Sequence, residues 1–178
     1  MSCSLSQDKI DATIAFHGHT CPGLAIGIRA AELAMERLAI HDTANSLCVT
    51  ETDMCGVDAI QFLAGCSFGK GNLVHRDYGK SAFTFFNRDT GKGFRALFTD
   101  LGRSRDMEKD QRTNLIMDAD LEDLFVLEDV DAPPVRPARI LKSIACDNCK
   151  ESTMESRIRL FDGKQLCQPC FKKVEQKI

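Results

Sequence analysis

Residues 16–38, FHGHTCPGLAIGIRAAELAMERL, decide the fold of the first part of this chain. Pro22 stands where a helix accepts proline, at its first position, because the N–H that proline lacks would be unpaired there anyway. Apolar residues then recur at helical spacing and form one stripe: Leu24, Ile28, Ala31, Met35 and Leu38. Neighbouring alanines and isoleucines widen the stripe. The pattern therefore predicts a long helix over 22–40 that is buried on most sides.

Shorter elements surround this helix along the chain. Further helices are predicted at 8–16, at 56–64 and within the charged stretch 106–125. Strands are predicted at 47–52, 72–78, 81–87, 93–99 and 138–145. The turn RDTGK between 81–87 and 93–99 indicates a β-hairpin. Mixed helices and strands predict an α+β domain over 1–132.

An acidic stretch and a proline-rich stretch follow this domain. Between Asp118 and Asp131 there are seven acids and no Lys or Arg, which we interpret as a solvated helix face and loop. Three prolines, Pro133, Pro134 and Pro137, are typical of a stiff linker. We therefore expect a linker and short strand over 133–143 and a separate module over 144–178.

The composition is that of a soluble globular protein, with 43% apolar and 28% charged residues and a net charge of -3. Such a charge gives no global attraction to nucleic acid or to anionic lipid. No run of about 18 apolar residues is present, so we expect no membrane span. The polar start does not resemble a signal peptide. Nine cysteines without an export signal favour a reducing compartment, and we expect a cytoplasmic protein.

The C-terminal module contains the spacing Cys146-x2-Cys149-x17-Cys167-x2-Cys170. Two such pairs can aim four sulfurs at one tetrahedral Zn²⁺, and so short a module needs the metal as its core. The gap contains a predicted hairpin, RIRLFDGKQL, and CFKKVEQKI after the second pair predicts a helix. This order indicates a treble-clef zinc finger. The alternatives are unconnected or disulfide-bonded cysteines, a redox CxxC pair and an iron–sulfur cluster, all of which we disfavour.

A second cluster, at the start of the long helix, contains His17, His19 and Cys21. Cys55, flanked by Asp53 and Asp58, precedes the helix predicted at 56–64. Two helix starts could bring these four side chains together, and His19, Cys21 and Cys55 could then bind a second Zn²⁺ or other divalent metal with an open position. All four residues are predicted active-site residues. The alternative is an ordinary hydrogen-bonded turn.

The segment GCSFGKGNL, residues 65–73, is not a phosphate-binding P-loop, because Gly71 follows Lys70 where Ser or Thr is required. A weaker interpretation is a glycine-rich loop in which Lys70 contacts an anionic cofactor. A plain loop explains the segment equally well. His75 and Tyr78 follow on a predicted strand, where core or surface placement is the simpler expectation. Cys66 could approach the site or pack in the core.

Two segments together, FHGHTCPGLAIGIRAAELAMERL and CGVDAIQFLAGCSFGKGNL, resemble the FmdE family of formylmethanofuran dehydrogenase-associated proteins over residues 10–130. The resemblance implies a thioredoxin-like α+β domain, a mixed β-sheet flanked by helices. It also implies a metal-containing active site at His17, His19, Cys21 and Cys55, and a C-terminal zinc finger as in many members. The family takes its name from molybdenum or tungsten formylmethanofuran dehydrogenase, whose chemistry belongs to other subunits.

Three functions compete at this point. The first is a metal-dependent enzyme or accessory protein in which His17 or His19 acts as general base. The second is a metal or cofactor carrier that serves a molybdenum or tungsten oxidoreductase, whose subunits would be its partners.

The third function is nucleic-acid binding through the finger, and it ranks last because acids are interleaved with the basic side chains. Those basic residues are Lys150, Arg157, Arg159, Lys164, Lys172, Lys173 and Lys177, and two aromatic residues, Phe161 and Phe171, lie among them. A homodimer, paired through the long helix and the phenylalanine-rich hairpin, is a further expectation.

Overall fold

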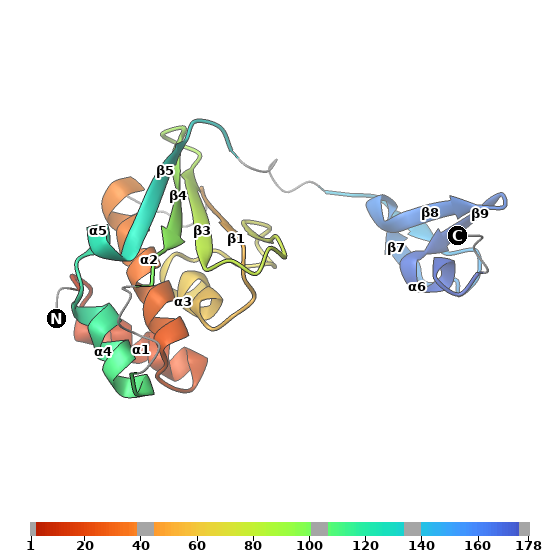
Figure 1. The fold of residues 1–178 in the computed structure, drawn as a ribbon. Helices are drawn as coiled ribbons and strands as arrows, with labels where there is room; N and C mark the ends of the chain where they lie inside the picture. Colours follow the sequence, from red (N-terminus) through yellow and green to blue (C-terminus); the bar gives the residue numbers. More distant parts are fainter. Residues whose placement is uncertain (1–2, 39–44, 101–106, 134–139, 175–178) are drawn as a thin grey trace. The chain divides into compact units, whose positions relative to one another are not determined.

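The computed structural model describes residues 3–38, 45–100, 107–133 and 140–174 of the chain (Figure 1). It divides into two compact units, residues 1–138 (unit 1) and 139–178 (unit 2). Each unit is described by itself. The linker predicted over 133–143 falls largely outside the described residues, so the boundaries predicted at 132 and 144 stay predictions.

The helices of unit 1 lie where apolar spacing predicted them. They are α1 (Gln7–His17), α2 (Pro22–Leu38), α3 (Gly56–Leu63), α4 (Lys109–Asp118) and α5 (Leu121–Leu124). Twelve of the 17 residues of α2 are buried, which confirms a helix enclosed on most sides. The predicted end of this helix at residues 39–40 lies outside the described residues. No described helix is both long and apolar enough to cross a membrane.

Five strands of unit 1 form one mixed sheet in the order β2-β1-β3-β4-β5. They are β1 (Ser46–Thr50), β2 (Leu73–His75), β3 (Ala82–Asn87), β4 (Lys92–Phe98) and β5 (Phe125–Val130). Strands β1 and β2 are parallel and connected through α3, whereas the other neighbours are antiparallel. The predicted α+β class and the β3–β4 hairpin are thus confirmed. The thioredoxin-like assignment stays a prediction.

Strand β5 corrects the interpretation of residues 118–131 as a helix face and loop. Phe125 pairs with Phe98 and Leu127 with Ala96 on β4, and Phe125 is buried. An edge strand needs only one apolar face, and these alternating residues supply it. The acids of this stretch therefore do not prevent a strand, because one face of β5 remains available to polar side chains.

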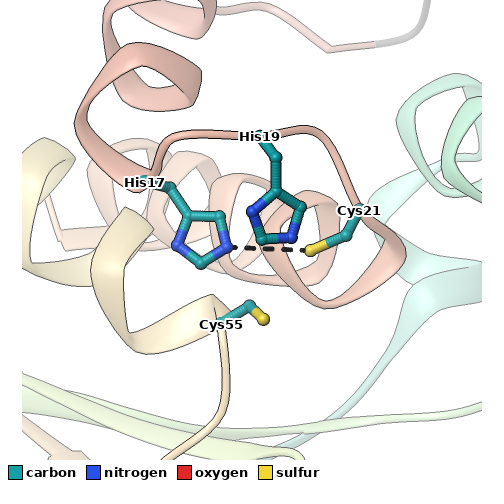
Figure 2. A group of neighbouring side chains, drawn as sticks. All are labelled: His17, His19, Cys21 and Cys55. Carbon is teal, nitrogen blue, oxygen red and sulfur yellow. Dashed lines mark hydrogen bonds between the residues drawn. The ribbon is translucent and has the colours of Figure 1, made fainter.

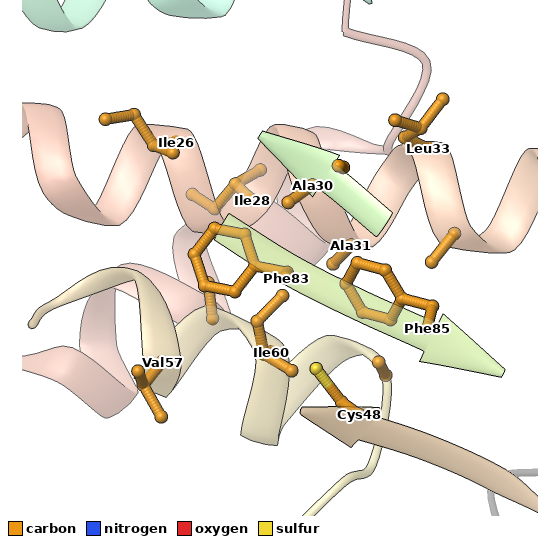
Figure 3. Packing of buried hydrophobic residues seen from close by; sticks show 14 of the residues in the cluster. Ile26, Ile28, Ala30, Ala31, Leu33, Cys48, Val57, Ile60, Phe83 and Phe85 are labelled. Atoms are coloured by element: carbon orange, nitrogen blue, oxygen red, sulfur yellow. The ribbon is translucent and has the colours of Figure 1, made fainter. Parts of the chain in front are cut away.

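The core of unit 1 lies between the sheet and the helices, with α2 against α3 and α4 and in contact with β3 and β4. Figure 3 shows Phe83 and Phe85 of β3 facing Ile28, Ala31 and Ile60. The phenylalanines of the hairpin are therefore enclosed within the unit and are not a free surface for pairing. The expected homodimer stays a prediction.

Unit 2 contains two small antiparallel sheets, β6 (Ser143–Ala145) with β7 (Ser152–Met154) and β8 (Ile158–Phe161) with β9 (Lys164–Cys167). A 3-10 turn (Glu155–Arg157) and α6 (Gln168–Phe171) complete it. Asp162 and Gly163 have φ of 48° and 71°, as the predicted hairpin turn requires. Helix α6 begins directly after Cys167, as expected. The remainder of the predicted helix, from residue 175, lies outside the described residues.

Candidate metal centre

Four metal-binding side chains of unit 1 converge, as Figure 2 shows. One donor atom from each lies within 4.8 Å of the donor atoms of the others. The four residues are His17, His19, Cys21 and Cys55, and we call them the His/Cys group. His17 ends α1, whereas Cys21 and Cys55 directly precede α2 and α3. The two helix starts singled out in the sequence thus meet.

Glycines allow this meeting, because α2 and α3 approach each other where neither has a side chain. A Cβ atom on Gly27 would lie 2.2 Å from the carbonyl oxygen of Gly56. A Cβ atom on Gly23 would lie 3.3 Å from the Cβ of Cys55. The contact fixes Cys55 beside the first turn of α2, and hence beside Cys21.

Hydrogen bonds orient two members of the His/Cys group. Nδ1 of His17 lies 2.7 Å from Oδ2 of Asp58, and since a carboxylate only accepts, Nδ1 donates. Nε2 of His17 is then left with its lone pair and lies 3.9 Å from Sγ of Cys21. The backbone N–H of Leu24 donates to the same sulfur at 3.3 Å. A carboxylate behind a histidine is a usual second contact of a metal site.

The donor set fits a soft divalent cation. Two thiols and two imidazoles are a common set of ligands for Zn²⁺. Burial raises the pKa of the Cys55 thiol, and the neighbouring Cys21 sulfur raises it further. Cys55 of the metal-free protein therefore keeps its proton at neutral pH, and a bound cation would have to displace it.

A cavity of about 450 Å³ lies beside the His/Cys group and shares His17 and Cys55 with it. Its other lining residues are Thr50, Thr52, Asp53, Met54, Val57, Asp58, Gln61, Phe68 and His75. Thr50 and His75 are paired in the register of the parallel strands β1 and β2. The cavity thus lies at the carboxyl ends of two parallel strands, a usual position for ligand sites in α/β structures.

Sequence reasoning missed part of this site. Asp58 was noted only as a neighbour of Cys55, and His75 was expected in the core or on the surface. Nε2 of His75 is shielded from solvent and has no hydrogen-bond partner among the described residues. Recognising residues 46–75 as a parallel strand–helix–strand unit would have indicated His75, because the ends of both strands then share one edge.

Lys70 is not among the described residues that line the cavity. Its Nζ donates to the carbonyl oxygen of Gly65 at 3.0 Å and so closes its own loop. Its predicted contact with an anionic cofactor stays a prediction. Cys66 packs in the core near Ser46, and Cys48 is buried in β1 as expected. Tyr78 is exposed.

The four cysteines of unit 2 form a second group, with donor atoms again within 4.8 Å of one another. Sγ of Cys149 lies 3.8 Å from Sγ of Cys167. Sulfurs bound about 2.3 Å from one tetrahedral Zn²⁺ are about 3.8 Å apart, so the spacing fits this ion. The backbone N–H of Cys167 and neighbouring N–H groups lower the pKa of Cys146 to about 6, which favours its thiolate at neutral pH.

Comparison with solved structures gives the same fold over nearly the whole chain. A crystal structure of an FmdE-like protein of the tungsten formylmethanofuran dehydrogenase type, from Syntrophus aciditrophicus, matches with a TM-score of 0.68. The match covers 96% of this chain and 95% of that one at 24% identity. At this identity the likeness establishes the fold alone.

Comparison with protein sequences identifies the family. A relative from Archaeoglobus fulgidus, named a probable S-adenosyl-L-methionine-binding protein, is 30% identical over 187 residues. The match covers 87% of this chain, which spans about half the length of that relative. Residues 139–176 match the prokaryotic dksA/traR C4-type zinc finger, which implies Zn²⁺ at the four cysteines of unit 2. Residues 16–129 match the family model described as FmdE, molybdenum formylmethanofuran dehydrogenase operon. The chain therefore belongs to the FmdE family.

Proposed function

We propose that unit 1 is a metal-binding domain whose His/Cys group holds Zn²⁺ or another divalent cation beside a cavity for a small ligand. The observation that carries this proposal is the convergence of four donor atoms within 4.8 Å from the end of α1 and the starts of α2 and α3. A metal bound there would supply a Lewis acid at the cavity wall.

The residues of the chain have distinct parts in this proposal. Asp58 positions His17 by holding Nδ1, so His17 serves as a ligand through Nε2. His19 is exposed, and its ring centre lies 4.4 Å from that of His17. Of the two histidines, His19 is the better placed to take a proton from a ligand in the cavity, because the proton-bearing nitrogen of His17 is already held.

We favour a metal-dependent enzyme or accessory protein of molybdenum- or tungsten-dependent oxidoreductase systems over a metal carrier. The support is the cavity, which a carrier does not need. The rate of metal exchange separates the two, since a carrier releases its metal readily to a competing chelator. The name of the A. fulgidus relative adds S-adenosyl-L-methionine to the ligands to be tested.

For unit 2 we propose a treble-clef finger closed by Zn²⁺. Nucleic-acid binding remains the least favoured function, because the two aromatic side chains of the finger pack on each other. The ring centres of Phe161 and Phe171 are 5.9 Å apart. A gel shift that weakens with salt would support this third function.

Metal content tests the proposal. After loading with excess Zn²⁺, the wild-type protein should hold two ions per chain, and a Cys21→Ala/Cys55→Ala variant should hold one. The matched control is Cys48→Ala/Cys66→Ala, which removes two other cysteines of unit 1 and should keep both ions. An unchanged metal count in the Cys21→Ala/Cys55→Ala variant would refute the site.

A further inference from the structure

The charge of the cavity beside the His/Cys group is negative. Two carboxylates, Asp53 and Asp58, line it, and the described lining residues include no Lys or Arg. A divalent cation held by two thiolates and two neutral imidazoles adds no net charge. The carboxylates therefore set the sign of the potential that an entering ligand meets.

Positive side chains near these segments are engaged elsewhere. Lys70 donates to the carbonyl oxygen of Gly65. Arg95 donates from Nε and Nη2 to both carboxylate oxygens of Glu51, at 2.6 and 2.9 Å. Arg95 lines a different cavity, of about 430 Å³, together with Arg76 and Lys80. These cations do not neutralise the cavity beside the His/Cys group.

Asp53 is the carboxylate that a ligand can use. Asp58 already accepts from His17 and from Nε2 of Gln61, which lies 3.1 Å from its Oδ1. Asp53, in contrast, is exposed and makes no hydrogen bond or ion pair with the described residues. The hydroxyl of Thr50 donates to the carbonyl oxygen of Thr52, so it is engaged as well.

The walls of the cavity suit a cation with an apolar body. Phe68 and Met54 line it and are 63% and 66% exposed, so both can move to cover a ligand. An aromatic face attracts organic cations, and a thioether adapts its shape to them. Val57 supplies a further apolar wall.

We propose that this cavity binds small organic cations and discriminates against anions through the carboxylate of Asp53. The inference rests on the proposed function, because a metal in the His/Cys group would hold the other end of the ligand. It adds the class of ligand and a specificity-determining residue that contacts no metal donor.

Two thiols of similar length and opposite charge test the inference: thiocholine, a quaternary ammonium, and 2-mercaptoethanesulfonate. Both offer the same sulfur to the metal, so the difference in their affinity reports the charged end. Isothermal titration of the fully zinc-loaded chain should show thiocholine binding tighter by at least about tenfold at low salt, and the ratio should shrink as salt rises. Asp53→Asn should reduce the ratio to about twofold.

Three controls make the outcome decisive. Asp110→Asn removes an exposed carboxylate on α4 and should leave the ratio unchanged. The Cys21→Ala/Cys55→Ala variant measures any binding of thiol to unit 2. Metal content is determined in the same samples, and absence of the second ion would overturn the proposed function itself. With two ions bound, equal affinities, tighter binding of the sulfonate, or a ratio that survives Asp53→Asn would overturn this inference alone.

Discussion

The two metal-binding groups of this chain use similar donors in different surroundings. In unit 2, the buried hydrophobic cluster consists of Leu166 and three of the cysteines. In unit 1, the His/Cys group lies at the margin of a core that extends over α2, α3 and the sheet. The first group is the centre of its module, whereas the second is added to a domain with a core of its own. The difference assigns structural work to one metal and leaves the other available for a ligand.

The two groups are also positioned by different means. Each pair of cysteines in unit 2 is separated by two residues, so local chain geometry directs the sulfurs toward one point. In unit 1, Cys21 and Cys55 lie 34 positions apart, and the packing of Gly27 against Gly56 brings their helices together. Disrupting each means of positioning tests the comparison.

The largest effect is expected from removal of the metal of unit 2. A Cys146→Ser/Cys149→Ser variant should leave residues 143–174 unfolded, because zinc contributes on the order of 10 kcal/mol to such modules. Hydrogen exchange followed by mass spectrometry should show lost protection in β8 and β9 and unchanged protection in α2. The Cys21→Ala/Cys55→Ala variant is the matched control and should keep protection in both units.

The comparison would fail in two ways. If β8 and β9 stayed protected without their metal, unit 2 would have a core that does not depend on zinc. If α2 lost protection in the Cys21→Ala/Cys55→Ala variant, the metal of unit 1 would be structural as well.

A smaller effect is expected where α2 meets α3. In Gly27→Ala the added methyl group would lie 2.5 Å from Cα of Gly56, so the helices must separate. Overpacking of this kind costs about 2 kcal/mol, although alanine is the better helix former by about 1 kcal/mol. We expect a lower free energy of unfolding for unit 1 in urea, and loss of the metal of unit 1 at a Zn²⁺ concentration that saturates the wild type.

Gly69→Ala is the matched control, because a Cβ atom there would have no heavy atom within 4 Å. Its free energy of unfolding should stay within about 0.5 kcal/mol of the wild type. A Gly27→Ala protein with wild-type stability and full metal content would show that the close helix contact is not what assembles the His/Cys group.

The sequence predicted the elements whose signals are local. The stripe of α2, the β3–β4 hairpin and the spacing of the four C-terminal cysteines each depend on neighbouring residues, and each is observed. Strand β5 was missed because its partner β4 supplies the pairing, whereas its own acids indicate exposure. Local composition cannot report a partner that lies about 30 residues away in the chain.

The candidate site was predicted in part for the same reason. Histidines and cysteines at helix starts can be recognised one by one, and all four members of the His/Cys group were. The roles of Asp58 and His75 depend on tertiary contacts, one across the start of α3 and the other through the register of β1 and β2. Neither residue belongs to a local metal-binding motif, so only the fold brings them to the site.

The smallest effect is expected from the carboxylate behind His17, and it tests whether unit 1 has a metal site separate from its core. Asp58→Asn keeps the size of the side chain but removes the charge that holds Nδ1 of His17 in the donating state. We expect affinity for Zn²⁺ at the His/Cys group to fall by about tenfold, as for other carboxylates behind metal-binding histidines. Competition with a fluorescent zinc chelator measures this change.

Gln61→Ala, which removes only a hydrogen bond to the same carboxylate, is the matched control and should weaken Zn²⁺ binding by less. The melting temperature of metal-free unit 1 should change little in either variant, because Asp58 is partly exposed and contributes no packing to the core. If Asp58→Asn instead lowered that melting temperature while zinc affinity stayed the same, Asp58 would be a structural residue of α3. The contrast between a metal that builds its module and a metal that is added to one would then rest on the four donors alone.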